Sequence, residues 1–373
     1  MSEAPAAVRQ FACTGCGAAL EVKPGTSSLV CPYCGATQVL DVVTSEDKHD
    51  FAAYLATDPP PVASLPPYDV RCRGCGATTS TTALSSRCSS CQAPIVSLET
   101  FDGKLHPPDA VVPFAIDKSA AITSFRSWTK SRWFAPNDLK KVGTAERLQG
   151  GFVPHWGFDD STTSDYVGER GEYYYVTESY TTQENGQTVT RTRQVRHTRW
   201  WPASGRVQRQ FEDVLAAAGT TVEAEDLHKL GPWGVPGATT CTPELLAGLS
   251  TPRYDVDASG GWGVARQVMA DVIEDDCRHD IGGDEQRVHQ VQTEDANVLF
   301  RLLLLPLWFA TYVLAGTTYQ VYINANTGKV IGDRPYSKVK IAFAVLGVLI
   351  AIAIGYLLYR ANQTPTPTYA PPG

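Results

Sequence analysis

Four Cys-x-x-Cys pairs before residue 92 constrain the fold of this chain more than any other feature, and they take up eight of its ten cysteines. The pairs form two sets of four, with 14 residues between the pairs of the first set and 12 in the second. Four thiolates arranged as a tetrahedron are a preferred zinc site, and two such turns on adjacent hairpins supply them. We therefore predict two structural zinc ions, with the ligand sets Cys13, Cys16, Cys31, Cys34 and Cys72, Cys75, Cys88, Cys91.

The segments around these pairs, residues 11–40 and 70–97, repeat one pattern and are predicted to be two zinc ribbons. A glycine follows the second cysteine of three pairs, which lets the backbone turn so that amides face the sulfurs. Units of this size need the metal to hold a fold. A redox Cys-x-x-Cys motif opens a helix in a βαβ unit, whereas these pairs lie on hairpins, so closed structural sites are favoured. The three glycines are Gly17, Gly35 and Gly76.

Between the ribbons, residues 41–69 are predicted to be a linker with one short helix near residues 46–56 and a Pro-rich, semi-rigid second half. Residues 107–336 are predicted to form an α+β body. Its expected helices cover residues 118–132 and 259–280, with strands between and after them.

The body contains a weak internal echo. VVPFAIDKSAAITSFRSWTK, from Val111, resembles TPRYDVDASGGWGVARQVMA, from Thr251, and FVPHWGFDD, from Phe152, resembles LLPLWFATY, from Leu304. The first pair of segments predicts an extended run followed by an Asp and a helix. We interpret the echo as two similar α+β halves, the second carrying an inserted strand pair, because Asp257 and Pro306 are farther apart than Asp117 and Pro154.

Residues 341–359 form an uncharged apolar run, which as a helix spans about 28 Å, close to the thickness of a bilayer. A buried core helix is the alternative, but the run has no polar face. We predict one transmembrane helix over residues 339–359 and a disordered tail over 360–373, rich in Pro and Thr. Arg334, Lys338 and Lys340 precede the uncharged run and only Arg360 follows it, so the N-terminal body is expected in the cytoplasm.

A second apolar stretch, residues 298–315, is shorter and is interrupted by Pro306. Arg301 would destabilise it by about 2.5–3.5 kcal/mol at the centre of a bilayer. We therefore predict strands buried in the body, followed by a hairpin turn at Asn326-Thr327-Gly328.

A charged, aromatic hairpin is predicted around Asn185-Gly186. Its second strand could stack on a nucleic acid or contact anionic lipid. With Asn185-Gly186 as the loop, however, Glu184 faces Gln187, Glu178 faces Arg193 and Glu172 faces Arg199, so the hairpin neutralises itself and is expected to project from the body. The candidate contact residues are Arg191, Arg193, Arg196, Arg199, Trp200 and Trp201.

No catalytic constellation stands out. His155 lies in an apolar run and is predicted to be a core histidine, and the cluster around His279 and His289 is predicted to be a helix end with a Gly-Gly turn. The sequence has no G-x-S-x-G, H-E-x-x-H or ATP-binding loop motif, so an enzyme is not expected.

Several stretches carry a family resemblance: CTGCGAAL, CPYCGA, FRSWTKSRWFAPNDLKK, LQGGFVPHWGFD, YVGERGEYYY, RHTRWWPASGRV, IGGDEQRV and YINANTGKVIGDRPYSKVKI. The chain resembles bacterial proteins labelled TFIIB-type zinc ribbon-containing, or primosomal protein N′-like helicase. The resemblance implies a two-ribbon, membrane-anchored body and no established activity.

We expect a membrane-tethered, non-enzymatic adaptor whose ribbons bind a protein partner on the cytoplasmic face. The alternative is a membrane-anchored protein that binds DNA or RNA without helicase activity. The net charge of −7 excludes a protein that coats nucleic acid through its overall charge.

Overall fold

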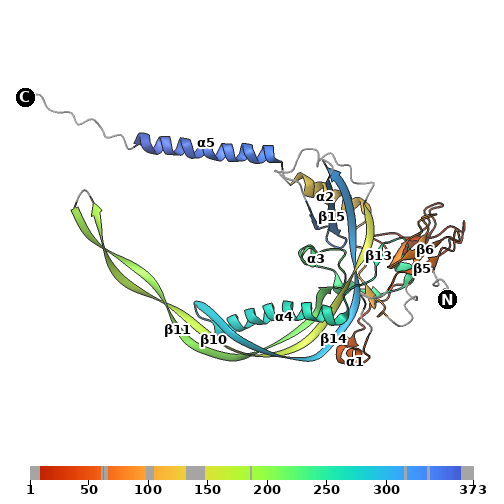
Figure 1. Cartoon of the computed structure of the whole chain (residues 1–373), viewed down its shortest axis with the longest axis horizontal. Helices are drawn as coiled ribbons and strands as arrows, with labels where there is room; N and C mark the ends of the chain where they lie inside the picture. The colour runs from red at the N-terminus through yellow and green to blue at the C-terminus, as the bar shows by residue number, and fades with distance from the viewer. Residues whose placement is uncertain are drawn as a thin grey trace, which may run out of the picture.

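The structure is a computed structural model of the chain (Figure 1). It describes residues 9–59, 62, 66–97, 105–131, 148–184, 187–314, 317–333 and 337–362. An α+β fold is observed, with two cysteine modules near the N-terminus, a curved sheet with helices, and a long C-terminal helix.

The body is built on one large sheet in which long strands follow the order β11-β10-β14-β15-β16, all antiparallel to their neighbours. Three short strands pair at its side. Buried apolar side chains cover both faces, because the central strand β14 is apolar on successive residues from Leu302 to Leu305. The long strands are β10 (Gln149–Glu184), β11 (Gln187–Ala217), β14 (Glu285–Leu314), β15 (Thr317–Asn324) and β16 (Val330–Gly332), and the short ones are β4 (His49–Asp50), β9 (Ala110–Val111) and β12 (Thr239–Thr240).

Strands β10 and β11 continue beyond the sheet as a projecting arm (Figure 1). β14 accompanies β10 as far as the Gly171–Glu285 pair, and from there on the arm is two-stranded. The predicted register is confirmed at every pair named from the sequence: Glu184 faces Gln187, Glu178 faces Arg193 and Glu172 faces Arg199. The Asn185-Gly186 loop lies outside the described residues.

Both predicted long helices are present, and an aspartate caps each. α2 (Lys118–Lys130) starts after Asp117, whose carboxylate accepts the Ala120 N–H, and α4 (Ala258–Ile281) starts after Asp257, which accepts the Gly260 N–H. α4 buries a stripe at helical spacing against β10 and β11: Ala258, Gly261, Ala265, Met269, Ile273, Cys277 and Ile281.

The echoed segments make matching hydrogen bonds. The Trp156 indole donates to the Val256 carbonyl at 2.9 Å, and its echo Trp308 donates to the Ile116 carbonyl at 3.3 Å. The Ala218 N–H donates to the Pro154 carbonyl and the Ala325 N–H to the Pro306 carbonyl. The segment that leads into each helix therefore accepts a hydrogen bond from the strand of the other repeat. An exchange of strands between two repeats would produce this arrangement.

One detail of the predicted repeat is wrong. No strand pair is inserted between Asp257 and Pro306, a stretch that the structure describes throughout. The extra residues lengthen the helix, since α4 has 24 residues and α2 has 13, and the first part of β14 runs along the arm.

The predicted linker is more than a spacer. Its first half adds β4, which pairs with β14, and α1 (Phe51–Leu55). The helix is shorter than the one expected over residues 46–56, because His49–Asp50 form β4 instead. Phe51 is buried against Phe158 and Phe300, with ring centroids 5.6 Å away in each case. This half of the segment is thus anchored to the body by aromatic packing.

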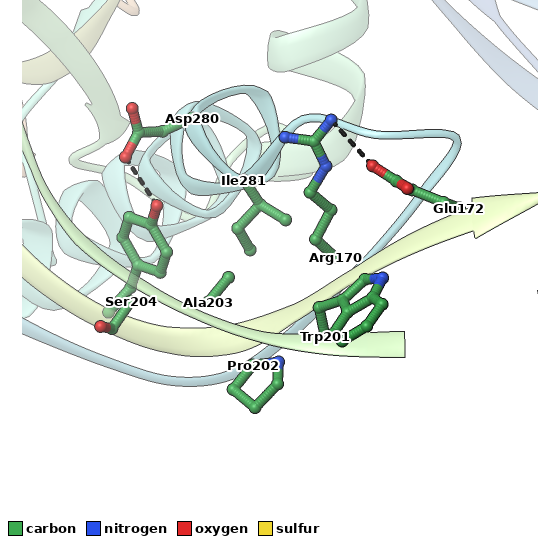
Figure 2. A pocket seen from close by; sticks show the side chains of 9 residues that line it. Arg170, Glu172, Trp201, Pro202, Ala203, Ser204, Asp280 and Ile281 are labelled. Atoms are coloured by element: carbon green, nitrogen blue, oxygen red, sulfur yellow. Dashed lines mark hydrogen bonds and ion pairs between the residues drawn. The ribbon is translucent and has the colours of Figure 1, made fainter. Parts of the chain in front are cut away.

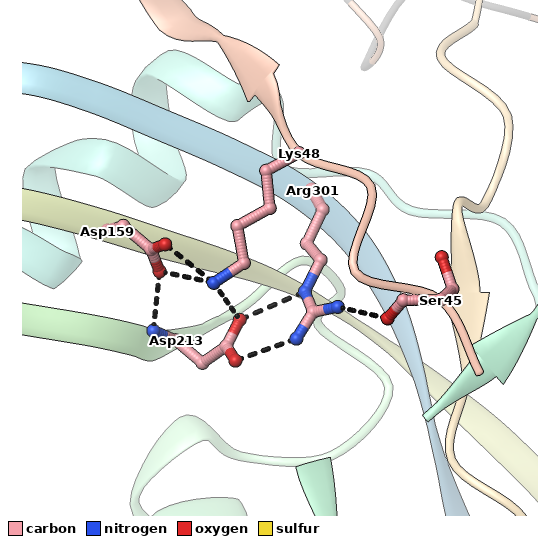
Figure 3. A network of polar contacts seen from close by, with 5 residues as sticks. All are labelled: Ser45, Lys48, Asp159, Asp213 and Arg301. Carbon is pink, nitrogen blue, oxygen red and sulfur yellow. Dashed lines mark hydrogen bonds and ion pairs between the residues drawn. The ribbon is translucent and has the colours of Figure 1, made fainter. Parts of the chain in front are cut away.

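The polar network in Figure 3 fixes the same segment. Lys48 lies 2.6 Å from Asp159, and Arg301 binds both Asp213 oxygens at 2.9 and 2.7 Å. The Arg301 guanidinium also donates to the Ser45 carbonyl at 3.0 Å. Arg301 is therefore paired inside the body, and the apolar run at residues 298–315 lies in a strand as far as Leu314, as predicted.

The chain's last described helix is α5 (Lys338–Asn362). Its segment Lys340–Arg360 is long and apolar enough to cross a membrane, and its apolar side chains are not buried against the described residues of the chain. The predicted turn before it is also present, with Gly328 at φ 75° between β15 and β16. The tail beyond residue 362 lies outside the described residues.

Candidate metal centres

The first cysteine module contains the strands β1 (Glu21–Val22), β2 (Ser28–Val30) and β3 (Thr37–Val39). The Cys13 and Cys34 sulfurs are 3.5 Å apart, and so are those of Cys16 and Cys31. Zinc–sulfur bonds of about 2.3 Å in a tetrahedron place sulfurs about 3.8 Å apart. The four thiols therefore already surround a zinc-sized position.

The second module has the same arrangement on two hairpins, β5 (Tyr68–Arg71) with β6 (Thr78–Thr81), and β7 (Ala83–Arg87) with β8 (Pro94–Val96). Cys72 and Cys91 approach to 3.6 Å and Cys75 and Cys88 to 3.7 Å. In each module one cysteine of every pair is buried and the other is exposed. The donor set is all-thiolate, with no place left for a substrate, as in structural zinc.

Backbone N–H groups donate hydrogen bonds to cysteine sulfurs in both modules and stabilise the thiolate form. The Cys34 and Tyr33 N–H groups lower the pKa of Cys31 to about 6, although burial opposes them. Burial raises the pKa of the Cys72 thiol, but the Cys75 amide and the Gln10 side chain outweigh it and bring the pKa to about 6. Thiolates are the ligand form, so these hydrogen bonds favour metal binding near neutral pH.

The two modules contact each other. Gln10, which precedes the first module, donates to the Cys72 sulfur at 3.6 Å and to the Pro94 carbonyl at 3.0 Å. Glu21 of the first module binds both terminal nitrogens of Arg87 in the second, at 2.6 and 2.7 Å. The ribbons therefore form a joined pair.

A groove of about 830 Å³ lies between the ribbons. Aromatic and small apolar side chains line it together with Arg73 and the Glu21–Arg87 pair. Tyr33 on its rim is 82% exposed. No ion pair joins Arg73 to another described residue, so its guanidinium can accept a carboxylate from a bound molecule.

The candidate contact residues on the arm do not form one patch. Because side chains alternate along β11, Arg196 and Trp200 lie on one face and the other four on the opposite face. Several are already engaged: Arg193 pairs with Glu178 at 3.2 Å, and the Arg196 guanidinium lies 4.1 Å from the Tyr173 ring centroid. Arg199 stacks on Tyr174.

A shallow pocket of about 640 Å³ lies where the arm leaves α4 (Figure 2). Trp201 projects along it, Arg170 pairs with Glu172 at 3.2 Å, and the Tyr166 hydroxyl donates to Asp280 at 2.6 Å. Four of its polar side chains therefore pair with one another. Trp201, 51% exposed, is the one candidate contact residue that lines it.

The histidine predictions agree with the structure. His155 is 3% exposed, and burial lowers its pKa to about 4, so it is a neutral core residue at pH 7. Gly282 ends α4 at φ 63°, and Asp284 accepts the Tyr173 N–H at 2.7 Å, which makes the histidine-flanked cluster a helix end that holds the arm.

The sequence interpretation missed a third group of ligand-type side chains, His49, His106 and Asp109. His106-Pro-Pro-Asp109 is too short a signal by itself, and His49 was placed in the linker. Only the pairing of β4 and β9 with β14 brings the three residues together.

Comparison with known proteins agrees with the geometry of the first module. Residues 9–43 match the family model described as FORGETTER1 first zinc ribbon domain. The N-terminal module is a zinc ribbon. With the two four-cysteine clusters, this confirms the prediction of two structural zinc ions.

The chain is also similar to "Uncharacterized protein YdjG" of Bacillus subtilis (strain 168), at 24% identity over 244 residues, which cover 65% of this chain and 67% of that protein. No solved structure matches. Neither of these two matches supports the TFIIB-type or helicase label of the family resemblance.

Proposed function

We propose that this chain is a membrane-tethered adaptor whose two zinc ribbons hold a segment of a protein partner in the groove between them. The observation that carries the proposal is the groove itself: it is lined by both ribbons and has an exposed aromatic residue on its rim and an arginine without an ion pair to a described residue. Exposed aromatic and arginine side chains are the residue types that dominate binding energy at protein interfaces.

The proposed partner segment is extended and carries an apolar side chain next to a carboxylate. The apolar side chain would pack beside Tyr33 and Phe11, and the carboxylate would pair with Arg73. α5 would anchor the chain in the membrane, and the basic residues that precede it favour a body in the cytoplasm.

The contacts on the arm favour a protein over a nucleic acid as the partner of this chain. A nucleic-acid clamp needs unpaired cations beside free aromatic faces. On the arm, Arg193 already pairs with Glu178, and Arg196 and Arg199 occupy the faces of neighbouring tyrosines.

Photocrosslinking in intact membranes tests the groove. A benzoylphenylalanine at Tyr33 should crosslink one defined protein, and the product should disappear when Cys31→Ser removes the first zinc. The matched control is the same probe at Tyr175, which is 62% exposed on the arm and outside the groove. Crosslinks to DNA or RNA would reject the adaptor in favour of nucleic-acid binding, and a protein product that survives Cys31→Ser would reject the ribbon groove as the binding site.

The identified partner then gives a quantitative test. Its purified form should bind the full chain at least 10-fold more weakly after Tyr33→Ala, because an aromatic side chain that a partner covers can contribute about 2 kcal/mol or more. Arg73→Glu should weaken binding by a similar factor, and Tyr175→Ala should leave the Kd unchanged. Equal affinities for all three variants would count against the groove.

Membrane attachment is tested separately. The full chain should stay with membranes in alkaline carbonate, and a variant ending at residue 336 should be released. A protease added to intact cells or spheroplasts should spare the body if it faces the cytoplasm, and digestion of the ribbons from outside would reverse the proposed orientation.

A further inference from the structure

Three side chains from separate segments meet beside the central strand of the body. His49 Nε2 lies 2.8 Å from Asp109 Oδ1, and His106 Nε2 lies 2.9 Å from Asp109 Oδ2. All three donor atoms are within 4.8 Å of one another. The cluster uses none of the residues of the ribbons.

Each of these side chains is held in place by the fold. Asp109 donates its N–H to the Leu302 carbonyl at 2.9 Å, and its carboxylate accepts the Leu302 N–H at 2.7 Å. The His106 N–H donates to the Tyr254 hydroxyl at 2.7 Å, and two prolines restrict the backbone between His106 and Asp109. The three ligand atoms are therefore oriented before any ion binds.

His49 arrives on a different element, β4, where it pairs with Phe300 of β14. The adjacent Lys48 fixes that element through its ion pairs with Asp159 and Asp213 (Figure 3). The two imidazole rings are 5.0 Å apart, and the ring of His106 packs against Tyr54, Trp156 and Phe300. Aromatic rings therefore pack against one side of the cluster.

The opposite side is open. The His49 side chain is 46% exposed, whereas those of His106 and Asp109 are 13% and 10% exposed. Two imidazoles and one carboxylate on one side of an ion, with solvent on the other, form a site typical of divalent first-row transition metals with free coordination positions. Metal–ligand bonds of about 2.1 Å at right angles place neighbouring donor atoms about 3.0 Å apart, close to the two distances observed.

We propose that His49, His106 and Asp109 bind a third metal ion, a divalent first-row transition metal, through the two Nε2 atoms and the carboxylate. Water fills the remaining positions from the His49 side. This ion differs from the ribbon zinc ions, because nitrogen and oxygen ligands replace thiolates and the coordination shell is open. The site is independent of the proposed partner groove.

Titration of the full-length protein, purified in detergent with both ribbons loaded with zinc, tests the site. Mn²⁺ is the first probe, because it prefers oxygen and nitrogen ligands and does not compete for thiolates. Electron paramagnetic resonance of free Mn²⁺ should show one bound ion per chain. Co²⁺ and Zn²⁺ uptake, measured by mass spectrometry of the metal after desalting, should each rise by one equivalent above the ribbon content.

His49→Gln should weaken the binding of this third ion at least 10-fold while the two ribbon zinc ions stay bound. His49 is half-exposed, so this variant keeps the fold. Asp109→Asn should abolish the site, with circular dichroism as a check on folding. The matched control is His289→Gln, on a histidine that is 52% exposed and outside the cluster, which should bind like the wild type. A wild type that takes up none of the three ions, or a His49→Gln variant that binds them unchanged, would overturn the proposal.

Discussion

The two zinc ribbons share a ligand set but join the body differently. In the first ribbon, Cys13, Leu20, Leu29 and Cys31 belong to the same apolar cluster as Phe125 and Trp308 of the body. The second ribbon has a small cluster of its own, Val70, Cys72, Cys88 and Ile95. It is attached mainly through the pairing of β7 with β13 (Thr251–Pro252).

The difference shows that one metal motif can serve two purposes. The zinc of the first ribbon holds apolar side chains in place that also pack against the body. Loss of this zinc should therefore destabilise parts of the body far from the metal site. The second ribbon has its own apolar cluster, which its zinc supports. Its contacts to the body include strand pairing, the Ser85 hydroxyl, which donates to the Leu249 carbonyl at 2.7 Å, and the Val96 side chain, which lies in the shared cluster. The effect of losing its zinc should stay local.

Removal of one zinc ligand from each ribbon gives the largest expected effect. Cys31→Ser and Cys88→Ser should each reduce the zinc content from two ions to one and unfold the affected module, because structural zinc contributes about 10–16 kcal/mol to modules of this kind. Only Cys31→Ser should also raise hydrogen exchange in α2 and β15, which border the shared cluster. Equal exchange in the body of both variants would remove the distinction between the ribbons.

Matched core truncations sharpen the same comparison without touching the metal. Leu29 and Val70 are both fully buried. Leu29→Ala should reduce the free energy of unfolding of the body by about 2–4 kcal/mol through the cavity it leaves in the shared cluster. Val70→Ala should lower only the stability of the second ribbon, by about 2 kcal/mol. Denaturant unfolding followed separately by tryptophan fluorescence and by zinc release reports the two regions.

Val39→Ala is the control for both truncations, since Val39 is 78% exposed on β3 and its removal should leave both transitions within about 0.5 kcal/mol of the wild type. If Val70→Ala shifts the fluorescence transition as much as Leu29→Ala does, the second ribbon is part of the body's cooperative unit after all.

The ion pair between the ribbons has a smaller effect. A double-mutant cycle on Glu21→Gln and Arg87→Met should give a coupling of about 1 kcal/mol, because the pair is bidentate and partly shielded. The comparison pair is Arg206 and Asp165 on the arm, also bidentate but more exposed, with an expected coupling below about 0.5 kcal/mol. Salt should weaken the second coupling more than the first, and the reverse order would argue that the ribbons do not shield their contact.

The sequence was sufficient wherever a local rule determines the structure. The spacing of the cysteines predicted both metal sites, Asp117 and Asp257 marked two helix starts, and the Asn-Gly loop gave the register of the arm. Contacts between distant segments were not predictable in this way. Nothing local places His49 beside Asp109, or Gln10 beside the sulfur of Cys72, because both depend on how β4, β9 and β8 pair in three dimensions.

The dependence on distant contacts also explains where the predictions for residues 41–69 and for the inserted strand pair differ from the structure. The sequence of residues 41–69 predicts a linker with one short helix and a semi-rigid second half, but it does not reveal that Phe51 and Lys48 have partners on the sheet, which only the folded chain supplies. The greater distance between Asp257 and Pro306 looks like an insertion, but a longer helix fills it because α4 follows the sheet toward the arm, where a long buried stripe is available.

The smallest expected effect concerns a residue in which the second ribbon departs from the other cysteine turns. Gly17, Gly35 and Gly76 follow their cysteine pairs with φ between 72° and 77°, but the fourth turn has Gln92 at φ 60°. A side chain disfavours this left-handed conformation by roughly 1 kcal/mol or more. Gln92→Gly should therefore stabilise the second ribbon by about 0.5–1 kcal/mol, less than the full strain, because glycine also makes the unfolded chain more flexible.

Gly76→Ala in the other turn of the same ribbon is the matched opposite change. A Cβ there would meet nothing within 4 Å, so the backbone conformation alone decides its effect, and the second ribbon should lose about 1 kcal/mol. Competition with a chromogenic zinc chelator measures the zinc affinity of both variants. A change that stabilises the folded, zinc-bound ribbon raises this affinity. Tighter zinc in Gln92→Gly and weaker zinc in Gly76→Ala, with the first ribbon unchanged in each, would show that the second ribbon responds as a local unit. A Gln92→Gly variant that binds zinc more weakly would mean that the Gln92 side chain makes a contact worth more than the strain of its backbone.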